Sequence, residues 1–220
     1  IVSNPPFSIS WPGDSDPTLI NDPRYSPAGV LAPQKKRADL AFTMHMLSWL
    51  SSEGKAAIVQ FPGVMYRGGA EQKIRRYLVD NNFVEAVIQL PANLFFGKVT
   101  ISTCILVLSK GKADDKILFV DASEEFVHVG NKNKLMSENI ERIYAAVHDR
   151  SEEEHFSKLV SIDKVGSEND YNLSVGIYVE RRDAREKVDI VELNERIKGI
   201  VAREQELREQ IDAIVADLGA

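Results

Sequence analysis

The chain has 220 residues, of which 44% are hydrophobic and 27% are charged, so we expect a folded globular protein with one sizeable core and an appendage. It contains no run of about 18 consecutive apolar residues, and no membrane-spanning helix is expected. The single cysteine, Cys104, lies in an apolar run and is expected to be a buried small side chain rather than a nucleophile. With one cysteine no disulfide framework is possible, which favours a reducing cytoplasm, and no membrane partner is expected. The four histidines lack the spacing of metal ligands, so we predict no metal site.

The net charge of −6 argues against a nucleic-acid partner, but the charges are unevenly distributed. Residues 34–112 carry eleven basic and five acidic side chains, whereas residues 113–220 carry fifteen basic and twenty-five acidic ones. Such asymmetry favours a polyanion bound to the basic part, with a simply solvated surface as the alternative. The candidates for contacting a nucleic acid are Lys35, Lys36, Arg37 and Arg67.

The first candidate functional segment is Asn4-Pro5-Pro6-Phe7, which follows the apolar pair Ile1-Val2 at the end of an expected strand. These residue types suit methylation of an exocyclic amine on a nucleic-acid base, whose lone pair is delocalised into the ring. The Asn4 side-chain oxygen and the Pro5 carbonyl are two acceptors that would hold the amine hydrogens out of the ring plane.

Two consecutive prolines make this segment a stiff loop that presents carbonyls, because proline lacks an N–H and has a fixed φ. Phe7 offers an apolar face on which an extruded base can stack. The alternative is that Pro5-Pro6 simply ends a strand while Phe7 fills the core.

The remaining elements alternate between strands and helices. Residues 8–33 form a long Pro-, Gly- and Asp-rich loop, which we expect to be a mobile flap over the site. Apolar spacing predicts strands over residues 56–61, 84–89, 101–108 and 117–120, the last at an edge, and helices over residues 38–50, 71–80 and 137–148. The Gly68-Gly69 pair before the second helix is expected to be a turn, with a phosphate cradle as the alternative.

This order predicts an α/β fold with a Rossmann-like sheet of the doubly wound kind. The strands over residues 84–89 and 101–108 should form a terminal antiparallel pair, because the link between them is too short for a crossover helix. The loops after the strands, at Asn4, Pro62 and Pro91, should converge where ligands bind in such sheets, beyond the carboxyl ends of the strands.

The C-terminal part of the chain has a different pattern. We expect residues 1–125 to be a partial catalytic domain, 126–182 a mixed helical and irregular connection, and 183–220 a helical tail. A heptad repeat with only Glu204 out of pattern predicts a coiled coil, with a helix folded back on its own domain as the alternative. The residues at its a and d positions are Ile190, Leu193, Ile197, Ile200, Leu207, Ile211, Ile214 and Leu218.

The chain resembles the methylation subunits of type I restriction–modification systems, which are adenine-specific DNA methyltransferases, from their Asn-Pro-Pro-Phe motif onward. The segments that carry the resemblance are Asn4–Phe7, Gly29–Phe42, Gly54–Leu78, Gln89–Lys110, Phe119–Ser123 and Asn169–Val179. The resemblance implies direct transfer of the sulfonium methyl group of S-adenosylmethionine to the exocyclic amine of adenine, with no covalent enzyme intermediate.

The same resemblance assigns roles to individual residues. It places the amine contact and the stacking of a flipped base on Asn4, Pro5 and Phe7, and a second aromatic contact on Phe95 or Phe96, between which the sequence does not choose. It implies that the tail docks against the DNA-specificity subunit, with a restriction subunit as a further possible partner.

The chain departs from the family at its beginning. The family's glycine-rich loop for S-adenosylmethionine, upstream of the Asn-Pro-Pro-Phe loop, is not found, nor is the helical domain before it. We therefore expect a truncated fragment that is inactive alone and binds the cofactor weakly at best. The alternatives are a non-catalytic fragment that acts only through its tail, and a related methyltransferase acting on RNA or on protein.

Overall fold

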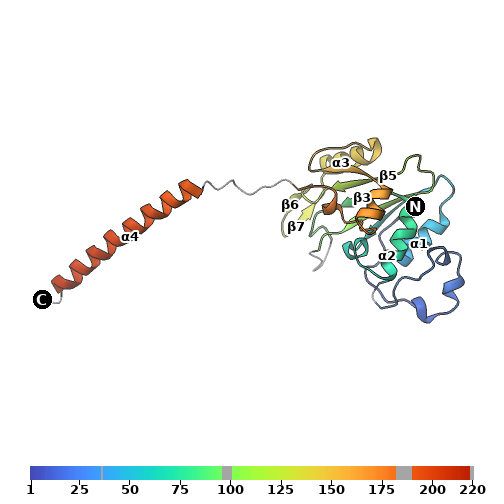
Figure 1. The fold of residues 1–220 in the computed structure, drawn as a ribbon, viewed down its shortest axis with the longest axis horizontal. Coiled ribbons are helices and arrows are strands. Elements are labelled where there is room, and N and C mark those ends of the chain that lie inside the picture. The colour runs from blue at the N-terminus through green and yellow to red at the C-terminus, as the bar shows by residue number, and fades with distance from the viewer. Residues whose placement is uncertain (36, 96–100, 182–189, 219–220) are drawn as a thin grey trace. The chain divides into compact units, whose positions relative to one another are not determined.

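Six strands form one mixed sheet in the computed structural model, which describes residues 1–35, 37–95, 101–181 and 190–218 (Figure 1). The order across the sheet is β1-β2-β4-β3-β5-β8. β1, β2, β3 and β5 run in the same direction, and β4 and β8 run antiparallel to their neighbours. The strands are β1 (Val2–Ser3), β2 (Lys55–Gln60), β3 (Val84–Gln89), β4 (Cys104–Ser109), β5 (Lys116–Asp121) and β8 (Ser157–Ser161).

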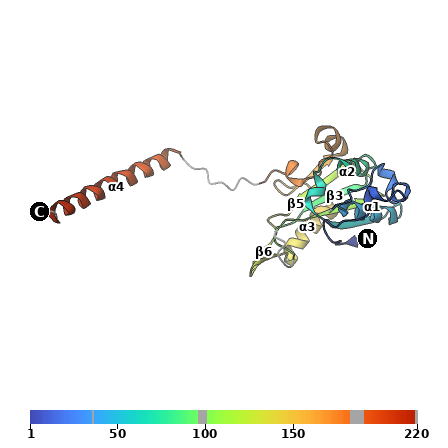
Figure 2. The ribbon, with the colours of Figure 1, turned by 90° about the horizontal axis from the view of Figure 1, so that it is seen from below.

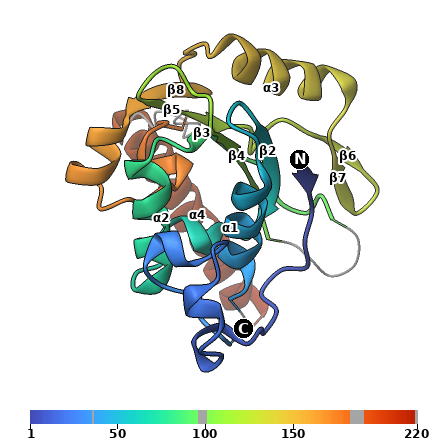
Figure 3. The same ribbon diagram turned by 90° about the vertical axis from the view of Figure 1, so that its right-hand side faces the viewer.

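Helices cover both faces of this sheet, as Figure 3 shows. On one face, α1 (Asp39–Trp49) and α2 (Ala70–Asp80) pack through apolar side chains such as Leu40 and Leu78. On the other face, α3 (Ser137–Asp149) packs Ile143 against β3 and β5. The predicted α/β fold and its three helices are thereby confirmed.

The antiparallel pairing predicted for the strands over residues 84–89 and 101–108 is confirmed, with Gln89 opposite Cys104. This pair is not at the end of the sheet, because β4 lies between β2 and β3. The edge position expected for residues 117–120 is wrong. β5 lies between β3 and β8, and Ile117, Leu118, Phe119 and Val120 are all fully buried, as in a strand covered on both faces.

Residues 126–181 belong to the main unit, because Ile1–Arg181 form one compact unit. β8 joins the main sheet, and β6 (Val127–Val129) pairs with β7 (Lys132–Lys134) in a hairpin that stands apart from it (Figure 2). The segment after β8 is fixed to α2 by the buried Arg75, which donates to the carbonyls of Val64 and Tyr171 at 2.8 Å each. Short helical turns lie at Gly13–Ser15, Leu19–Asn21, Ser26–Ala28, Pro62–Met65, Lys164–Glu168 and Val175–Ile177.

Residues 8–33 are more ordered than the long loop that we expected. They contain three helical turns, and Trp11 lies edge-on to Tyr25 with ring centroids 5.3 Å apart. The Trp11 indole N–H donates to the carbonyls of Ala32 and Pro33 at 3.2 and 3.1 Å. This segment packs against α1 and α2, and its proposed role as a mobile flap stays a prediction.

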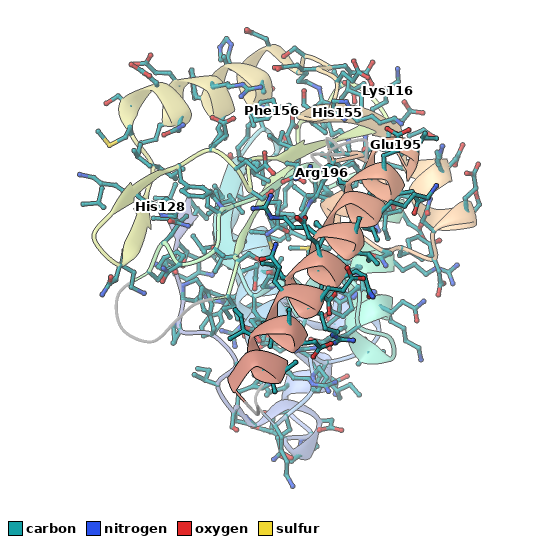
Figure 4. The ribbon with its side chains drawn as sticks, turned by 90° about the vertical axis from the view of Figure 1, so that its left-hand side faces the viewer. Lys116, His128, His155, Phe156, Glu195 and Arg196 are labelled. Carbon is teal, nitrogen blue, oxygen red and sulfur yellow. The ribbon has the colours of Figure 1, made fainter. Side chains whose placement is uncertain are left out.

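Residues Arg182–Ala220 form the second unit, in which α4 (Ile190–Leu218) is one continuous helix. The predicted helical tail is therefore confirmed, whereas its coiled-coil partner stays a prediction. The heptad side chains from Leu193 to Ile214 are exposed, whereas for Ile190 and Leu218 only the backbone is described. Glu195 and Arg196 project from the same helix (Figure 4). No helix of the described residues is long and apolar enough to cross a membrane.

Candidate functional site

The carboxyl ends of β1, β2 and β3 lie at one edge of the sheet, since these strands run in the same direction. The loops that follow β1 and β3 meet there. The rings of Phe7 and Phe95 contact each other edge to face, with centroids 6.2 Å apart and an interplanar angle of 87°. The predicted convergence of the Asn4 and Pro91 loops is thereby confirmed.

The Asn4–Phe7 loop is open to solvent. Asn4 and Pro6 are exposed, whereas Pro5 and Phe7 are half-buried. Within the described residues the Asn4 side chain forms no hydrogen bond, so both its amide oxygen and its amide nitrogen are available to a ligand. Phe7 belongs to neither hydrophobic core cluster, which argues against the alternative that it only fills the core.

A buried polar chain fixes the end of this loop. Ser8 has a left-handed backbone (φ +53°), and its N–H donates to Oδ1 of Asp39 at 2.9 Å. Asp39 is 1% exposed at the first position of α1. Gln60, at the end of β2, donates to the Asp39 carbonyl at 3.1 Å and to the Thr43 hydroxyl at 2.6 Å. Through these contacts α1 and β2 determine where the loop turns.

Sequence reasoning missed this polar chain. Asp39 and Gln60 are polar residues at positions that the apolar pattern makes internal, and a buried polar group needs a hydrogen-bond partner. That mismatch is the signal that could have identified them. Oδ2 of Asp39 and Oε1 of Gln60 have no hydrogen-bond partner in the part of the chain that the structure describes.

The second loop carries Phe95 beyond β3. Its start is anchored, because Pro91 is buried and the Gln89 side chain donates to the Thr103 carbonyl at 3.1 Å. Asn93 turns the chain with a left-handed backbone (φ +59°), and Phe95 is half-buried against Phe7. Phe96, the other candidate for stacking the base, lies outside the described residues.

Two of the four basic candidates, Arg37 and Arg67, flank a buried carboxylate. Arg37 and Arg67 each place a guanidinium nitrogen 3.5 Å from Glu71, which is fully buried in the first turn of α2. Burial raises the pKa of the Glu71 carboxyl, and the charges of Arg67, Arg37 and Arg75 oppose that increase. Arg37 and Arg67 are thus partly neutralised within the protein.

The other basic candidates have different surroundings. Lys35 is exposed, and Lys36 lies outside the described residues. Arg67 also lies over the ring of Phe61, with its guanidinium carbon 4.9 Å from the ring centroid.

The two glycine-bearing turns at this edge differ in the space around them. A Cβ on Gly63 would lie 2.5 Å from Phe61 and 2.6 Å from Arg67. Gly69 (φ +72°) precedes α2, which confirms the predicted turn into the helix. Gly63 is closely packed, whereas no atom of the described residues lies within 4 Å of a Cβ on Gly68 or Gly69, so the turn before α2 is open. That turn lacks the glycine spacing of a nucleotide-binding loop, and the residues that would hold S-adenosylmethionine are not apparent among those described.

Metal ligands and a reactive thiol are also not seen in the described part of the chain. No group of three or more His, Cys, Asp or Glu residues in it is arranged to hold a metal ion. Cys104 is 1% exposed, and burial raises the pKa of its thiol to about 12, which confirms its prediction as a buried small side chain.

Comparison with known proteins assigns the family. The sequence model of the N-6 DNA Methylase family matches residues 1–187. The chain is 49% identical to the type I restriction enzyme MpnII methylase subunit of Mycoplasma pneumoniae, over 99% of this chain and 40% of that protein. It is 35% identical to the MjaVIII methylase subunit of Methanocaldococcus jannaschii, over 90% of this chain and 34% of that protein.

A solved structure is similar in both fold and sequence. It is the methyltransferase subunit of a type I restriction–modification system from Streptococcus thermophilus, with a TM-score of 0.77 and 39% identity. The alignment covers 81% of this chain and 37% of that one, so the chain spans well under half the length of these similar proteins. The chain belongs to the N-6 DNA Methylase family, and the proteins that it resembles are methylase subunits of type I restriction enzymes.

Proposed function

We propose that this chain supplies the base-binding half of an adenine-specific DNA methyltransferase, which transfers a methyl group from S-adenosylmethionine to the exocyclic amine of adenine. The observation that carries the proposal is the contact between Phe7 and Phe95, because it joins the Asn-Pro-Pro-Phe loop to a second aromatic loop at the carboxyl edge of the sheet. The relatives named above are methylase subunits, which favours the same reaction.

The residues of the first loop have complementary tasks. The Asn4 side-chain oxygen and the Pro5 carbonyl accept the two amine hydrogens, which frees the nitrogen lone pair for attack on a methyl group. Pro5 and Pro6 keep these acceptors in place with little backbone freedom. Phe7 stacks on the extruded base, and Phe95 contacts the base from a second side. Preorganised acceptors of this kind stabilise the positive charge that develops on the attacking nitrogen.

The methyl donor requires residues beyond those described. Gly63 is closely packed, and the open Gly68-Gly69 turn lacks the glycine spacing of a nucleotide-binding loop. We propose that the donor is held by a glycine-rich loop that this chain lacks, and that the chain alone therefore transfers no methyl group.

The tail supplies the partner contact in this proposal. Ile197, Ile200, Ile211 and Ile214 form an exposed apolar stripe on α4, at the spacing of a coiled-coil seam. We propose that this stripe packs against helices of a DNA-specificity subunit, and that the basic residues Lys35, Lys36, Arg37 and Arg67 contact DNA. A restriction subunit is a further possible partner. The single cysteine and a DNA substrate fit a cytoplasmic site of action.

A replacement experiment tests the proposal. The chain would replace the corresponding segment of the Mycoplasma pneumoniae relative, and the chimera would be purified with the specificity subunit of that system. Transfer of labelled methyl from S-adenosylmethionine to DNA, with N6-methyladenine as the product, is expected for the chimera and not for the 220-residue chain alone.

Three other results would contradict the proposal in different ways. Robust methyl transfer by the chain alone would refute the proposal that the methyl donor is held by a loop outside this chain. A chimera that assembles with its partner but methylates nothing would favour a non-catalytic interaction fragment. Methylation of RNA or of protein glutamine, with none of DNA, would favour the other alternative.

A further inference from the structure

The β6–β7 hairpin is tied to the loop that carries Phe95 by a cluster of hydrogen bonds. The Lys132 ammonium donates to Oδ1 of Asn93 at 2.8 Å, and the Asn93 amide donates to the Asn131 carbonyl at 2.8 Å. The Asn133 N–H donates to the Asn93 carbonyl at 3.2 Å, and its side chain donates to the Ala92 carbonyl at 2.9 Å. Both polar atoms of the Asn93 side chain are therefore used by the hairpin.

This cluster acts where the loop turns. Asn93 has a left-handed backbone, which asparagine adopts more readily than most L-residues because its short side chain can form hydrogen bonds locally. Two residues later the chain places Phe95 against Phe7. Leu94 packs on the core beneath α3, so the loop is held from below by apolar contact and from the side by the hairpin.

The β6–β7 hairpin is not expected to be stable by itself. Its strands have three residues each, and the side chains of Val127, His128 and Val129 are exposed. His128 projects from the hairpin in Figure 4. A two-stranded hairpin of this size is at best marginally stable in water, so its conformation depends on contacts such as those with the Asn93 loop.

We infer that Lys132 is a positioning residue for the base-binding site, which acts through Asn93 to keep Phe95 against Phe7. The inference rests on the proposed function, in which Phe95 contacts the base from a second side. Lys132 touches the loop and has no assigned contact with the substrate. Its effect is therefore expected on the rate of the chemical step more than on DNA affinity.

The hairpin supplies a matched control in Lys134. It carries the same charge two residues away in β7 and is exposed, and no contact joins it to the Asn93 loop in the described structure. If the hairpin acted only by attracting DNA phosphates, the loss of either lysine would weaken DNA binding similarly. If Lys132 acts by positioning, only its loss disturbs the two aromatic rings.

The first measurement follows the geometry in the 220-residue chain itself. Labelled phenylalanine would give a nuclear Overhauser cross-peak between the rings of Phe7 and Phe95. We expect the cross-peak in the natural chain, in Lys134→Ala and in the conservative variant Lys132→Arg, and its loss in Lys132→Ala at an unchanged melting temperature. A cross-peak of full intensity in Lys132→Ala would overturn the inference.

The second measurement follows kcat and the DNA dissociation constant in the chimera described above. We expect Lys132→Ala to lower kcat by about tenfold, since misplacing a reacting group by 1 Å can cost about 100-fold, with DNA affinity within about twofold. Lys132→Arg should restore most of kcat. Equal losses in Lys132→Ala and Lys134→Ala, confined to DNA affinity, would overturn the inference in favour of charge alone.

The two measurements separate failure of the inference from failure of the proposed function. If the chimera does not methylate DNA, the proposed function fails, and the cross-peak still decides whether Lys132 positions Phe95. If Lys132→Ala loses the cross-peak while kcat stays unchanged, Lys132 is not a positioning residue for catalysis, and Phe95 loses its assigned task as well.

Discussion

Replacing Asp39 by alanine should disturb the Asn4–Phe7 loop although Asp39 touches none of the residues assigned to the base. Its carboxylate accepts the Ser8 N–H at 2.9 Å, and Ser8 is held in a left-handed conformation next to Phe7. In Asp39→Ala the Ser8 N–H loses its acceptor, and its backbone is free to leave that conformation. The loop would then sample arrangements in which Asn4 and Phe7 no longer face the same ligand.

The magnitude follows from the kind of hydrogen bond that is lost. A hydrogen bond to a charged group contributes about 1.5–3 kcal/mol, and the left-handed conformation that it offsets costs an L-residue about 1–2 kcal/mol. A loss of about 2 kcal/mol corresponds to about a 30-fold change in an equilibrium constant, so kcat in Asp39→Ala should fall by up to that factor. The free energy of unfolding should fall by about 1–3 kcal/mol.

The assay is methyl transfer by the chimera, with DNA affinity and the free energy of unfolding measured in parallel. Asp39→Asn keeps an oxygen that can accept from Ser8, and because neutral hydrogen bonds are about half as strong, kcat should fall only about fivefold. Ser8→Gly is the matched control, since glycine tolerates the same φ and keeps its N–H. Its kcat should stay within about threefold of the natural value. Wild-type kcat in Asp39→Ala, at the expected loss of stability, would refute this reasoning.

Three further changes have outcomes that follow from the described contacts. Arg75→Ala should lower the free energy of unfolding by about 2–5 kcal/mol, or the melting temperature by about 5–15 °C, because two buried carbonyls lose their donor. The control, Arg76→Ala at an exposed position, should change the free energy of unfolding by at most about 0.5 kcal/mol. Equal effects of the two substitutions in a thermal melt would contradict the role of Arg75. Burial lowers the pKa of Lys112 to about 8 from an ordinary value of 10.5, so between these pH values the unfolded chain binds more protons than the folded one. The natural chain should therefore gain stability over Lys112→Met as the pH rises from 8 towards 10.5. A difference in melting temperature between the natural chain and Lys112→Met that does not change with pH would count against this prediction. Ile200→Asp should weaken binding of the specificity subunit by more than about tenfold in a titration, while Ile1–Arg181 stay folded. The control, Glu206→Ala, lies off the heptad seam and should leave binding unchanged. Equal binding by both variants would show that the tail does not contact the specificity subunit.

The fold was predictable where the apolar pattern had one interpretation. The run over residues 84–89 and the one that became β4 are separated by too few residues for a crossover, which fixed their antiparallel pairing. β8 was not predicted, since Ser157-Lys158-Leu159-Val160-Ser161 carries only two apolar residues. The segment forms a strand because it pairs with β5. Without β8, β5 looked like an edge strand.

The candidate site was predictable where a short motif has its own chemistry. Asn4-Pro5-Pro6-Phe7 combines acceptors, a rigid backbone and an aromatic face within four residues, so one sequence was enough to single it out. The residues that hold the loops of the site in place were not predictable, because the contacts of Asp39 with Ser8 and of Lys132 with Asn93 join residues 31 and 39 positions apart. Only the fold brings such pairs together.

The most direct test of the account is the effect of Asn4→Ala on methyl transfer by the chimera, measured together with its DNA affinity. Asn4 is exposed and makes no hydrogen bond to the described residues, so its loss should leave folding intact. If Asn4 accepts an amine hydrogen as the methyl group arrives, kcat should fall by about 100-fold or more, as on removal of one preorganised hydrogen-bonding group, while the DNA dissociation constant stays within about threefold. A variant that methylates adenine at the natural rate would contradict the role of this loop in holding the base.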